Sequence, residues 1–234
     1  MASKKTKQEE ASTAFENPEV LAEQLGRTEQ FIESNKNLVL GVLVGLIVVV
    51  AAIFGYRYYI GQQNEIAQSN LFQAIYYFEA DSLSLALNGD GNDLGFLDII
   101  DEYGSTDAAN LATYYAGVCF LKQGQYADAV DYLESFSSDD LLIQAKAYSL
   151  IGDAHMELSM FDDAADYYNK AANSKSNGQF SPDYLLKAGL AYEKSSDLQS
   201  AKEAYDEIVE KYENSTSALE ARKRSAWLAQ KLDN

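Results

Sequence analysis

One long apolar segment interrupts a chain whose other apolar residues alternate with polar ones. Residues 38–56 form a run of 19 residues without a charged side chain. A helix rises about 1.5 Å per residue, so this run nearly crosses a bilayer core of about 30 Å. It ends in Tyr-Arg-Tyr-Tyr at 56–59, which supplies the aromatic rings and the cation typical of a membrane interface. The pattern predicts a transmembrane helix over 38–59, between an N-terminal segment, 1–37, and a larger domain, 60–234.

Basic residues are concentrated before the apolar run. Five precede it: Lys4, Lys5, Lys7, Arg27 and Lys36. Between Arg57 and Lys122 there is none. Because segments rich in Lys and Arg stay in the cytoplasm, we expect a cytoplasmic N-terminus and an exported C-terminal domain. A cleaved signal peptide would need a shorter apolar core and a small-residue cleavage site, so we expect an uncleaved single-pass anchor in a bacterial inner membrane, with a periplasmic domain.

Two weaker features accompany the anchor. Gly41 and Gly45 form a GxxxG pair that permits close contact with a second membrane helix, although Gly is common in membrane helices in general. From Leu21 to Ile32, mainly apolar residues recur at intervals of four, three and four. This spacing predicts a short amphipathic helix near the cytoplasmic surface. Such a helix either docks on the cytoplasmic loops of a partner or only fixes the topology, and the second interpretation is favoured.

The large domain contains an internal repeat. Three segments align on Gly117, Gly152 and Gly189, at spacings of 35 and 37 residues. Each glycine is followed by an aromatic residue or His three positions on, an apolar residue nine on and Ala twelve on. These residues are Phe120, His155 and Tyr192, then Tyr126, Phe161 and Leu198, then Ala129, Ala164 and Ala201. Small residues let two antiparallel helices approach closely, so the pattern predicts stacked helix pairs.

The aligned Gly, aromatic and Ala positions resemble those of the tetratricopeptide repeat. The Trp and the late Pro of that repeat are absent, so the three units are degenerate. The resemblance implies a helical-repeat solenoid. Together with the apolar run, it predicts an all-α fold: a single N-terminal transmembrane helix followed by a tetratricopeptide-like helical-repeat solenoid. Residues 64–87 predict a long helix leaving the membrane, which ends at a turn over 88–93. Residues 218–232 predict a last helix, with Ala218, Ala221, Ser225, Leu228 and Leu232 on the face that covers the end of the solenoid.

Charge and composition exclude several functions. The chain has 18 Lys and Arg against 36 Asp and Glu, a formal net charge of -18. Proteins that bind DNA or RNA need a positive surface, so nucleic acid is excluded as a partner. A single Cys and a single His argue against a disulfide scaffold and a multi-His metal site. Phosphate-binding glycine loops, zinc-protease motifs and nucleophile elbows are missing. We therefore expect no enzyme, no cofactor and no small-molecule substrate.

Two candidate chemical sites are weak. Asn88, Asp90 and Asn92 fit the first oxygen positions of an EF-hand loop, but the later Gly and the bidentate acid are missing, so an ordinary turn is favoured. Cys119 and His155 are the only candidates for a thiol–imidazole pair. Both fall within repeat helices at positions that pack against neighbours, which favours a structural role.

A binding surface is the remaining candidate site. Repeat solenoids bind through a concave face formed by the first helix of each unit. The groove positions of the tetratricopeptide repeat correspond here to Leu111, Tyr114, Val118, Leu121 and Lys122 in the first unit, to Lys146, Ser149, Asp153, Met156 and Glu157 in the second, and to Asp183, Leu186, Leu190, Glu193 and Lys194 in the third. The first unit is mostly apolar, and an exposed apolar patch indicates a partner site. The helix from Asn64 onward would fill the same groove equally well.

The order of the parts carries a second resemblance. Four features follow one another along the chain: the lead ending at 28–36, the Gly-rich anchor ending at 55–59, Ala-Gln-Ser at 67–69 and the degenerate repeats. In these features and their order, the chain resembles YfgM-like proteins over nearly its whole length. These are ancillary subunits of the SecYEG translocon that associate with the membrane-anchored periplasmic chaperone PpiD. The resemblance implies a non-enzymatic scaffold that assists the handover of exported proteins, with SecYEG, a PpiD-like chaperone and the lipid bilayer as partners. The alternative is a scaffold of another envelope machine, for cell-wall synthesis, division or outer-membrane assembly.

Overall fold

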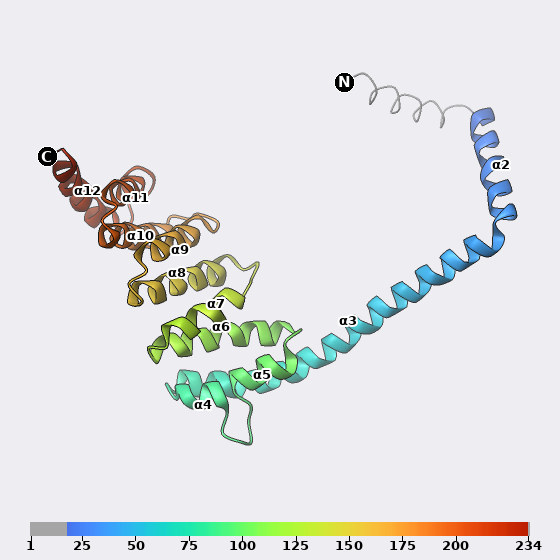
Figure 1. Ribbon diagram of the computed structural model, residues 1–234, viewed down its shortest axis with the longest axis horizontal. Helices are drawn as coiled ribbons and strands as arrows, with labels where there is room; N and C mark the ends of the chain where they lie inside the picture. Colours follow the sequence, from blue (N-terminus) through green and yellow to red (C-terminus); the bar gives the residue numbers. More distant parts are fainter. Residues whose placement is uncertain (1–17, 234) are drawn as a thin grey trace. The chain divides into compact units, whose positions relative to one another are not determined.

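The computed structural model describes residues 18–233, and the regular structure of these residues is entirely α-helical (Figure 1). The chain divides into two compact units, residues 1–59 and 60–234. The helices are α2 (Pro18–Ser34), α3 (Lys36–Glu79), α4 (Leu83–Asn88), α5 (Phe96–Tyr103), α6 (Asp107–Lys122), α7 (Tyr126–Ser135), α8 (Leu141–Glu157), α9 (Phe161–Asn173), α10 (Ser181–Ser195), α11 (Leu198–Lys211) and α12 (Ala218–Leu232).

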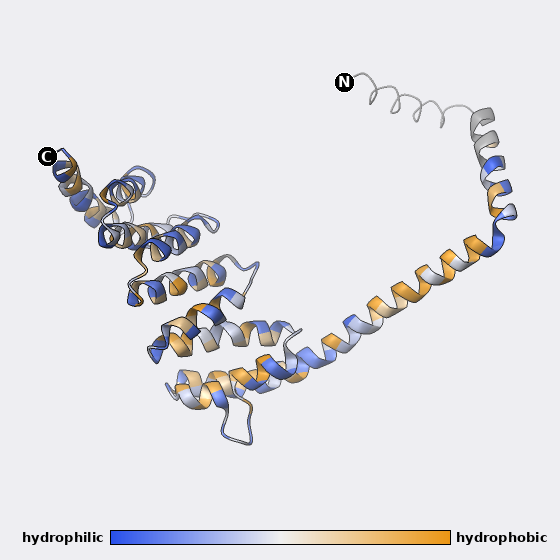
Figure 2. Cartoon of the chain, viewed as in Figure 1, coloured by the Kyte–Doolittle hydropathy of each residue, from blue (hydrophilic) through white to orange (hydrophobic). Residues whose placement is uncertain are grey.

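The first unit holds α2 and the first half of α3. α2 covers the segment from Leu21 to Ile32, where the apolar spacing predicts a short helix. α3 then runs unbroken through the apolar segment and is long and apolar enough to cross a membrane (Figure 2). Its apolar side chains are exposed on all sides, as with Ile47 and Phe54, and such a helix requires an apolar surrounding. The three N-terminal lysines used to predict topology lie outside the described residues.

The helix predicted over residues 64–87 is wrong in one respect, because it breaks near its end. α3 continues from the apolar segment to Glu79, and the chain then turns before α4 begins at Leu83. Asp81 adopts a left-handed backbone conformation at this turn, with φ of 55°. The Lys122 ammonium lies 2.7 Å from the Asp81 carboxylate, so a contact distant in sequence accompanies the break.

The turn predicted at 88–93 is present. The Asp90 carboxylate accepts hydrogen bonds from the backbone N–H groups of Asn92 and Asp93, both at 2.9 Å, and from the hydroxyl of Tyr77. An Asp side chain that binds the backbone two and three residues later forms a compact turn. These hydrogen bonds lower the pKa of Asp90, because they stabilise its charged form.

The second half of α3 is the first layer of the repeat domain. Ala67, Leu71 and Ala74 are buried in one apolar cluster with residues of α5 and α6. The Asn64 side chain accepts a hydrogen bond of 3.0 Å from the N–H of Ala108, one of the otherwise unpaired donors at the start of α6. This half of α3 is therefore integral to the solenoid.

Three helix pairs follow: α6 with α7, α8 with α9, and α10 with α11, each packed on its neighbours in sequence (Figure 1). The aligned glycines lie where the paired helices approach most closely. A Cβ at Gly152 would lie 2.7 Å from a ring carbon of Tyr168, and one at Gly189 would lie 2.3 Å from a ring carbon of Tyr205. At Gly117 the neighbour is Leu133, at 2.5 Å. The prediction of stacked helix pairs is confirmed.

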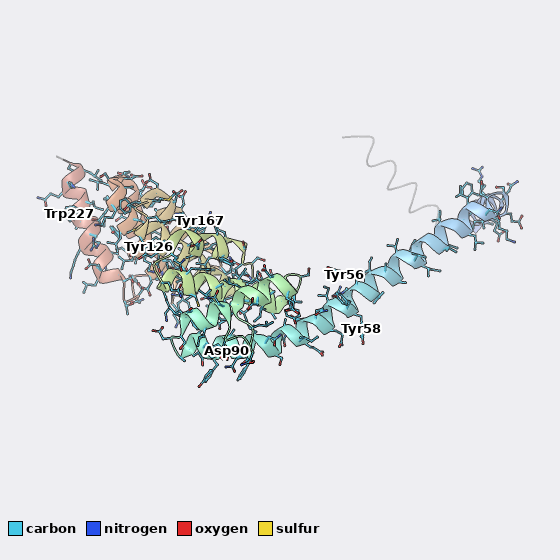
Figure 3. The ribbon with its side chains drawn as sticks, turned by 60° about the horizontal axis from the view of Figure 1, so that its bottom comes forward. Tyr56, Tyr58, Asp90, Tyr126, Tyr167 and Trp227 are labelled. Atoms are coloured by element: carbon cyan, nitrogen blue, oxygen red, sulfur yellow. The ribbon has the colours of Figure 1, made fainter. Side chains whose placement is uncertain are left out.

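α12 closes the end of the array. Ala218, Ala221 and Leu228 are buried against α11, as predicted. Leu232 is exposed, so the packed face of α12 is one turn shorter than the sequence suggests. Trp227 projects away from the neighbouring helices (Figure 3) and is half exposed.

Candidate partner-binding groove

The first helices of the three pairs, α6, α8 and α10, carry the predicted groove residues. N-terminal caps support two of these helices. The Thr106 hydroxyl accepts a hydrogen bond from the N–H of Ala109 at the start of α6. The Asp140 carboxylate accepts from the N–H groups of Leu142 and Ile143 at the start of α8. Each cap satisfies donors that a helix leaves unpaired at its N-terminus, and so stabilises the helix that presents the groove.

The apolar residues of the first unit are half-buried rather than open. Tyr114, Val118 and Leu121 pack against a cluster of α7 and α8 side chains that includes Leu150. Leu111 packs instead against the cluster that α3, α5 and α6 share. The helix from Asn64 onward therefore lies near Leu111, whereas the other three residues are partly covered by the second helix pair.

The remaining predicted residues fall in different surroundings. Lys122 is exposed, and besides its ion pair its ammonium lies 5.2 Å from the ring centroid of Phe78. Met156 is partly buried against the α9–α10 cluster, and Leu186 against the α11–α12 cluster. Leu190 is half-buried on α10. The structure thus brings Tyr114, Val118 and Leu121 together but gives the other predicted residues separate neighbours.

An ion pair joins Asp153 of α8, a predicted groove residue, to Lys187 of α10, which the groove spacing did not predict. The Lys187 ammonium lies 2.7 and 3.0 Å from the two carboxylate oxygens of Asp153, and 3.3 Å from the hydroxyl of Ser149. Ser149 is fully buried, whereas Asp153 and Lys187 keep about a third of their side chains exposed. Lys187 lies two residues before the aligned Gly189. A charged residue so close to a packing position was the sequence signal that could have indicated an ion pair there. The pair ties the second unit to the third.

Two tyrosines from different units lie in the same neighbourhood. Burial raises the pKa of the Tyr114 hydroxyl, and the nearby hydroxyls of Tyr115 and Tyr184 raise it further. Burial likewise raises the pKa of Tyr184, with contributions from the carboxylates of Asp183 and Asp153. The side chains between α6 and α10 therefore combine half-buried aromatic rings with a charged pair, a mixture suited to a protein segment.

In the second and third helix pairs, a buried tyrosine of the second helix donates a hydrogen bond to a carboxylate of the first helix. The Tyr168 hydroxyl donates to Asp153 at 2.7 Å, and the Tyr205 hydroxyl donates to Glu193 at 2.6 Å. Burial raises the pKa of both tyrosines, and the carboxylate partners raise it further. Arg224 of α12 also donates to Glu193 at 2.9 Å, which connects the last helix to the third pair. These contacts hold the helices that carry the groove.

The other candidate residues lie apart from this region. A Cβ added at Gly41 or Gly45 would meet nothing within 4 Å, so both face outward from α3. Cys119 is buried in the cluster that α3, α5 and α6 share, whereas the buried His155 stacks on Tyr167 of α9. Burial raises the pKa of the Cys119 thiol to about 12. Between residues 18 and 233, no three His, Cys, Asp or Glu side chains are grouped to hold a metal ion.

Comparison with known proteins identifies the repeat. Two models of the tetratricopeptide repeat match, one over residues 120–182 and the other over 183–215. These ranges contain the second and third helix pairs and part of the first. Residues 120–215 therefore match the tetratricopeptide repeat, and the fold of the repeat domain is tetratricopeptide-like. Both models describe a repeat that typically forms non-enzymatic interaction scaffolds, and neither is a catalytic family. No curated protein matches the chain at a significant level.

Solved structures support the same tetratricopeptide fold. Two crystal structures of a Podospora anserina protein with nearly identical tetratricopeptide-like repeats, assigned as a kinesin light chain, superpose with a TM-score of 0.51. They are 14% identical to this chain and cover 70% of it, and the chain covers 84% and 85% of theirs. A crystal structure of MamA is 20% identical to this chain and superposes with a TM-score of 0.42. The match covers 59% of this chain and 85% of MamA. At these identities the likeness to the kinesin light chain structures shows the fold alone.

Proposed function

We propose that this protein is a membrane-anchored scaffold whose tetratricopeptide domain binds other envelope proteins. The observation that carries the proposal is the combination, in one chain, of a helix suited to crossing a membrane and a repeat array with half-buried aromatic and charged side chains on its first helices. Tetratricopeptide arrays present extended surfaces that suit protein segments. In this proposal the anchor holds the array near its partners.

The specific partners that we propose are SecYEG and a PpiD-like periplasmic chaperone. The support is the resemblance to YfgM-like proteins in the lead, the anchor and the repeats. The excess of Lys and Arg before the anchor supports an exported repeat domain in the bacterial inner membrane. Residues 60–234 hold 12 Lys and Arg against 29 Asp and Glu, a net charge of -17, which favours solubility for a domain that handles unfolded clients. A scaffold of cell-wall synthesis, division or outer-membrane assembly is the alternative.

The groove of this scaffold combines the predicted residues with those that the structure adds. Tyr114, Val118 and Leu121 would offer apolar contact, beside Lys187 and its partner Asp153. Lys122, Leu111, Met156, Leu186 and Leu190 would lie at its margins. In the membrane, Gly41 and Gly45 would contact a helix of the partner machine.

Photo-crosslinking tests this proposal directly. A photoreactive phenylalanine analogue replaces exposed Lys146 on α8, at a groove position, in cells that carry the full chain. Exposed Arg222 on α12 is the matched control position. We expect adducts with a chaperone or translocon subunit from position 146 only. Adducts with other envelope machinery would favour the alternative, and equal adducts from both positions would reject the groove.

A further inference from the structure

A pocket of about 440 Å³ lies between α7, α8 and α9. Leu133, Phe136 and Ile151 are the buried apolar residues that line it, together with the rings of Tyr148 and Tyr167. Glu134 of α7 and Lys170 of α9 are exposed at its rim. We call this site the Tyr167 pocket, after the residue marked in Figure 3. Its volume falls within the range of about 300–1,000 Å³ typical of ligand sites.

The Tyr167 pocket opens on a different face of α8 from the Asp153–Lys187 pair, although Phe136, which lines the pocket, contacts the ring of Tyr114. On α8 it uses Gln144, Tyr148 and Ile151, which recur at intervals of four and three and so share one face. The groove contacts of α8, Ser149 and Asp153, lie roughly half a turn away by the same period. One helix therefore presents two different surfaces.

The charged side chains that line the pocket are one carboxylate, Glu134, and one ammonium, Lys170. The Tyr167 hydroxyl donates a hydrogen bond to a Glu134 carboxylate oxygen. Burial, this bond and the charge of Glu134 raise the pKa of Tyr167 to about 12, so the phenol stays neutral. Asp131 lies one helical turn before Glu134, and Asp163 lies one turn before Tyr167. The Tyr167 hydrogen bond thus holds the Glu134 carboxylate in place at the pocket.

An ammonium group of the chain itself already uses this site. The Lys170 Nζ lies 4.0 Å from the centroid of the Tyr167 ring, within the range of a cation–π contact. Tyr167 is supported from behind by His155, whose ring stacks on it at 5.4 Å between centroids. Lys170 is exposed, so it can move aside for a competing cation.

We propose that the Tyr167 pocket binds an arginine side chain of a protein partner. A guanidinium group stacks on aromatic rings and pairs with a carboxylate through two parallel hydrogen bonds, and the pocket supplies both Tyr rings and Glu134. The net charge of -17 over residues 60–234 favours a basic partner segment. This site goes beyond the groove, and it does not depend on which envelope machine the scaffold serves.

The probe is Nα-acetyl-arginine methylamide, and the matched control is its citrulline analogue, which has the same shape without the charge. Full-length protein is placed in nanodiscs of zwitterionic phosphatidylcholine, because anionic lipid would itself bind arginine. Saturation-transfer difference NMR then measures which ligand contacts the protein. We expect saturation at the arginine δ-methylene that is at least fivefold stronger than for citrulline.

Three substitutions locate the contact. Glu134→Gln keeps an acceptor for Tyr167 but removes the charge, and should lower the arginine signal about fivefold. Lys170→Gln removes the internal competitor and should raise it about twofold. Glu203→Gln, at an exposed position of α11, is the matched control and should change nothing. Equal signals from arginine and citrulline, or equal signals from the Glu134 and Glu203 variants, would overturn the proposal. Both outcomes leave the crosslinking test of the groove unaffected.

Discussion

At the residue scale, the structure explains why glycine recurs in the repeat. Gly152 and Gly189 each face a tyrosine ring sixteen residues later, and Gly117 faces Leu133 at the same interval. The close-packing role of the glycines was predictable from the sequence, because glycine stands at the same position in all three units. It did not reveal their partners, because that position changes from Leu to Tyr and only tertiary packing shows that both fill the same space.

Gly152→Ala should destabilise the domain. The added methyl group would overlap the Tyr168 ring, which is held by its hydrogen bond to Asp153 and so cannot simply move away. Overpacking of this kind costs about 1–3 kcal/mol of unfolding free energy. Gly178→Ala is the matched control, because a Cβ there meets nothing within 4 Å. Urea denaturation compares the two variants, and equal midpoints would contradict the packing described for Gly152.

Stability should also fall at high pH. The pKa of Tyr167 is raised to about 12, and the pKa values of Tyr168 and Tyr205 are raised as well, above an unfolded value of about 10. The unfolded chain therefore loses these protons first, so the stabilisation is complete below pH 10 and is lost as pH rises through 12. Urea denaturation between pH 8 and pH 11 measures the decline. Tyr168→Phe combined with Tyr205→Phe should flatten it, and an unchanged slope would contradict this origin.

At the element scale, the helix pairs were predictable but the division of α3 was not. Apolar periodicity continues from Asn64 to Leu87, so a single helix was the natural prediction. The break after Glu79 coincides with the left-handed Asp81 and its ion pair to Lys122, and the sequence gives no sign of that distant contact. The groove was predictable only in part, again because distant contacts decide which residues are covered. Family spacing located α6, whereas the coverage of Tyr114 by the next pair depends on how the pairs stack.

Two truncations test whether the second half of α3 belongs to the solenoid. A chain of residues 60–234 keeps Ala67, Leu71 and Ala74 in the core and should be helical and cooperative in thermal unfolding. A chain of residues 83–234 exposes the apolar faces of α5 and α6 that these residues cover, and should aggregate or unfold at least 10 °C lower. Circular dichroism and size-exclusion chromatography compare the two. Equal stability would show that α3 adds nothing to the domain.

At the scale of the whole molecule, the proposed membrane orientation is inferred from the Lys and Arg bias around the apolar segment. A phosphatase that folds only in the periplasm, fused after Asn234, should be active, whereas a fusion before Pro18 should not. Reversal of the two activities would place the repeat domain in the cytoplasm and remove the proposed export partners. The repeat fold would be unaffected.

The central proposal is that the tetratricopeptide-like domain, anchored by α3, serves as a scaffold at the export channel. The most direct measurement is to solubilise membranes in a mild detergent, capture the full chain by a C-terminal tag and identify the proteins that come with it. The account predicts SecYEG subunits together with a membrane-anchored periplasmic chaperone. Cell-wall, division or outer-membrane assembly factors in their place, with no channel subunit, would contradict it.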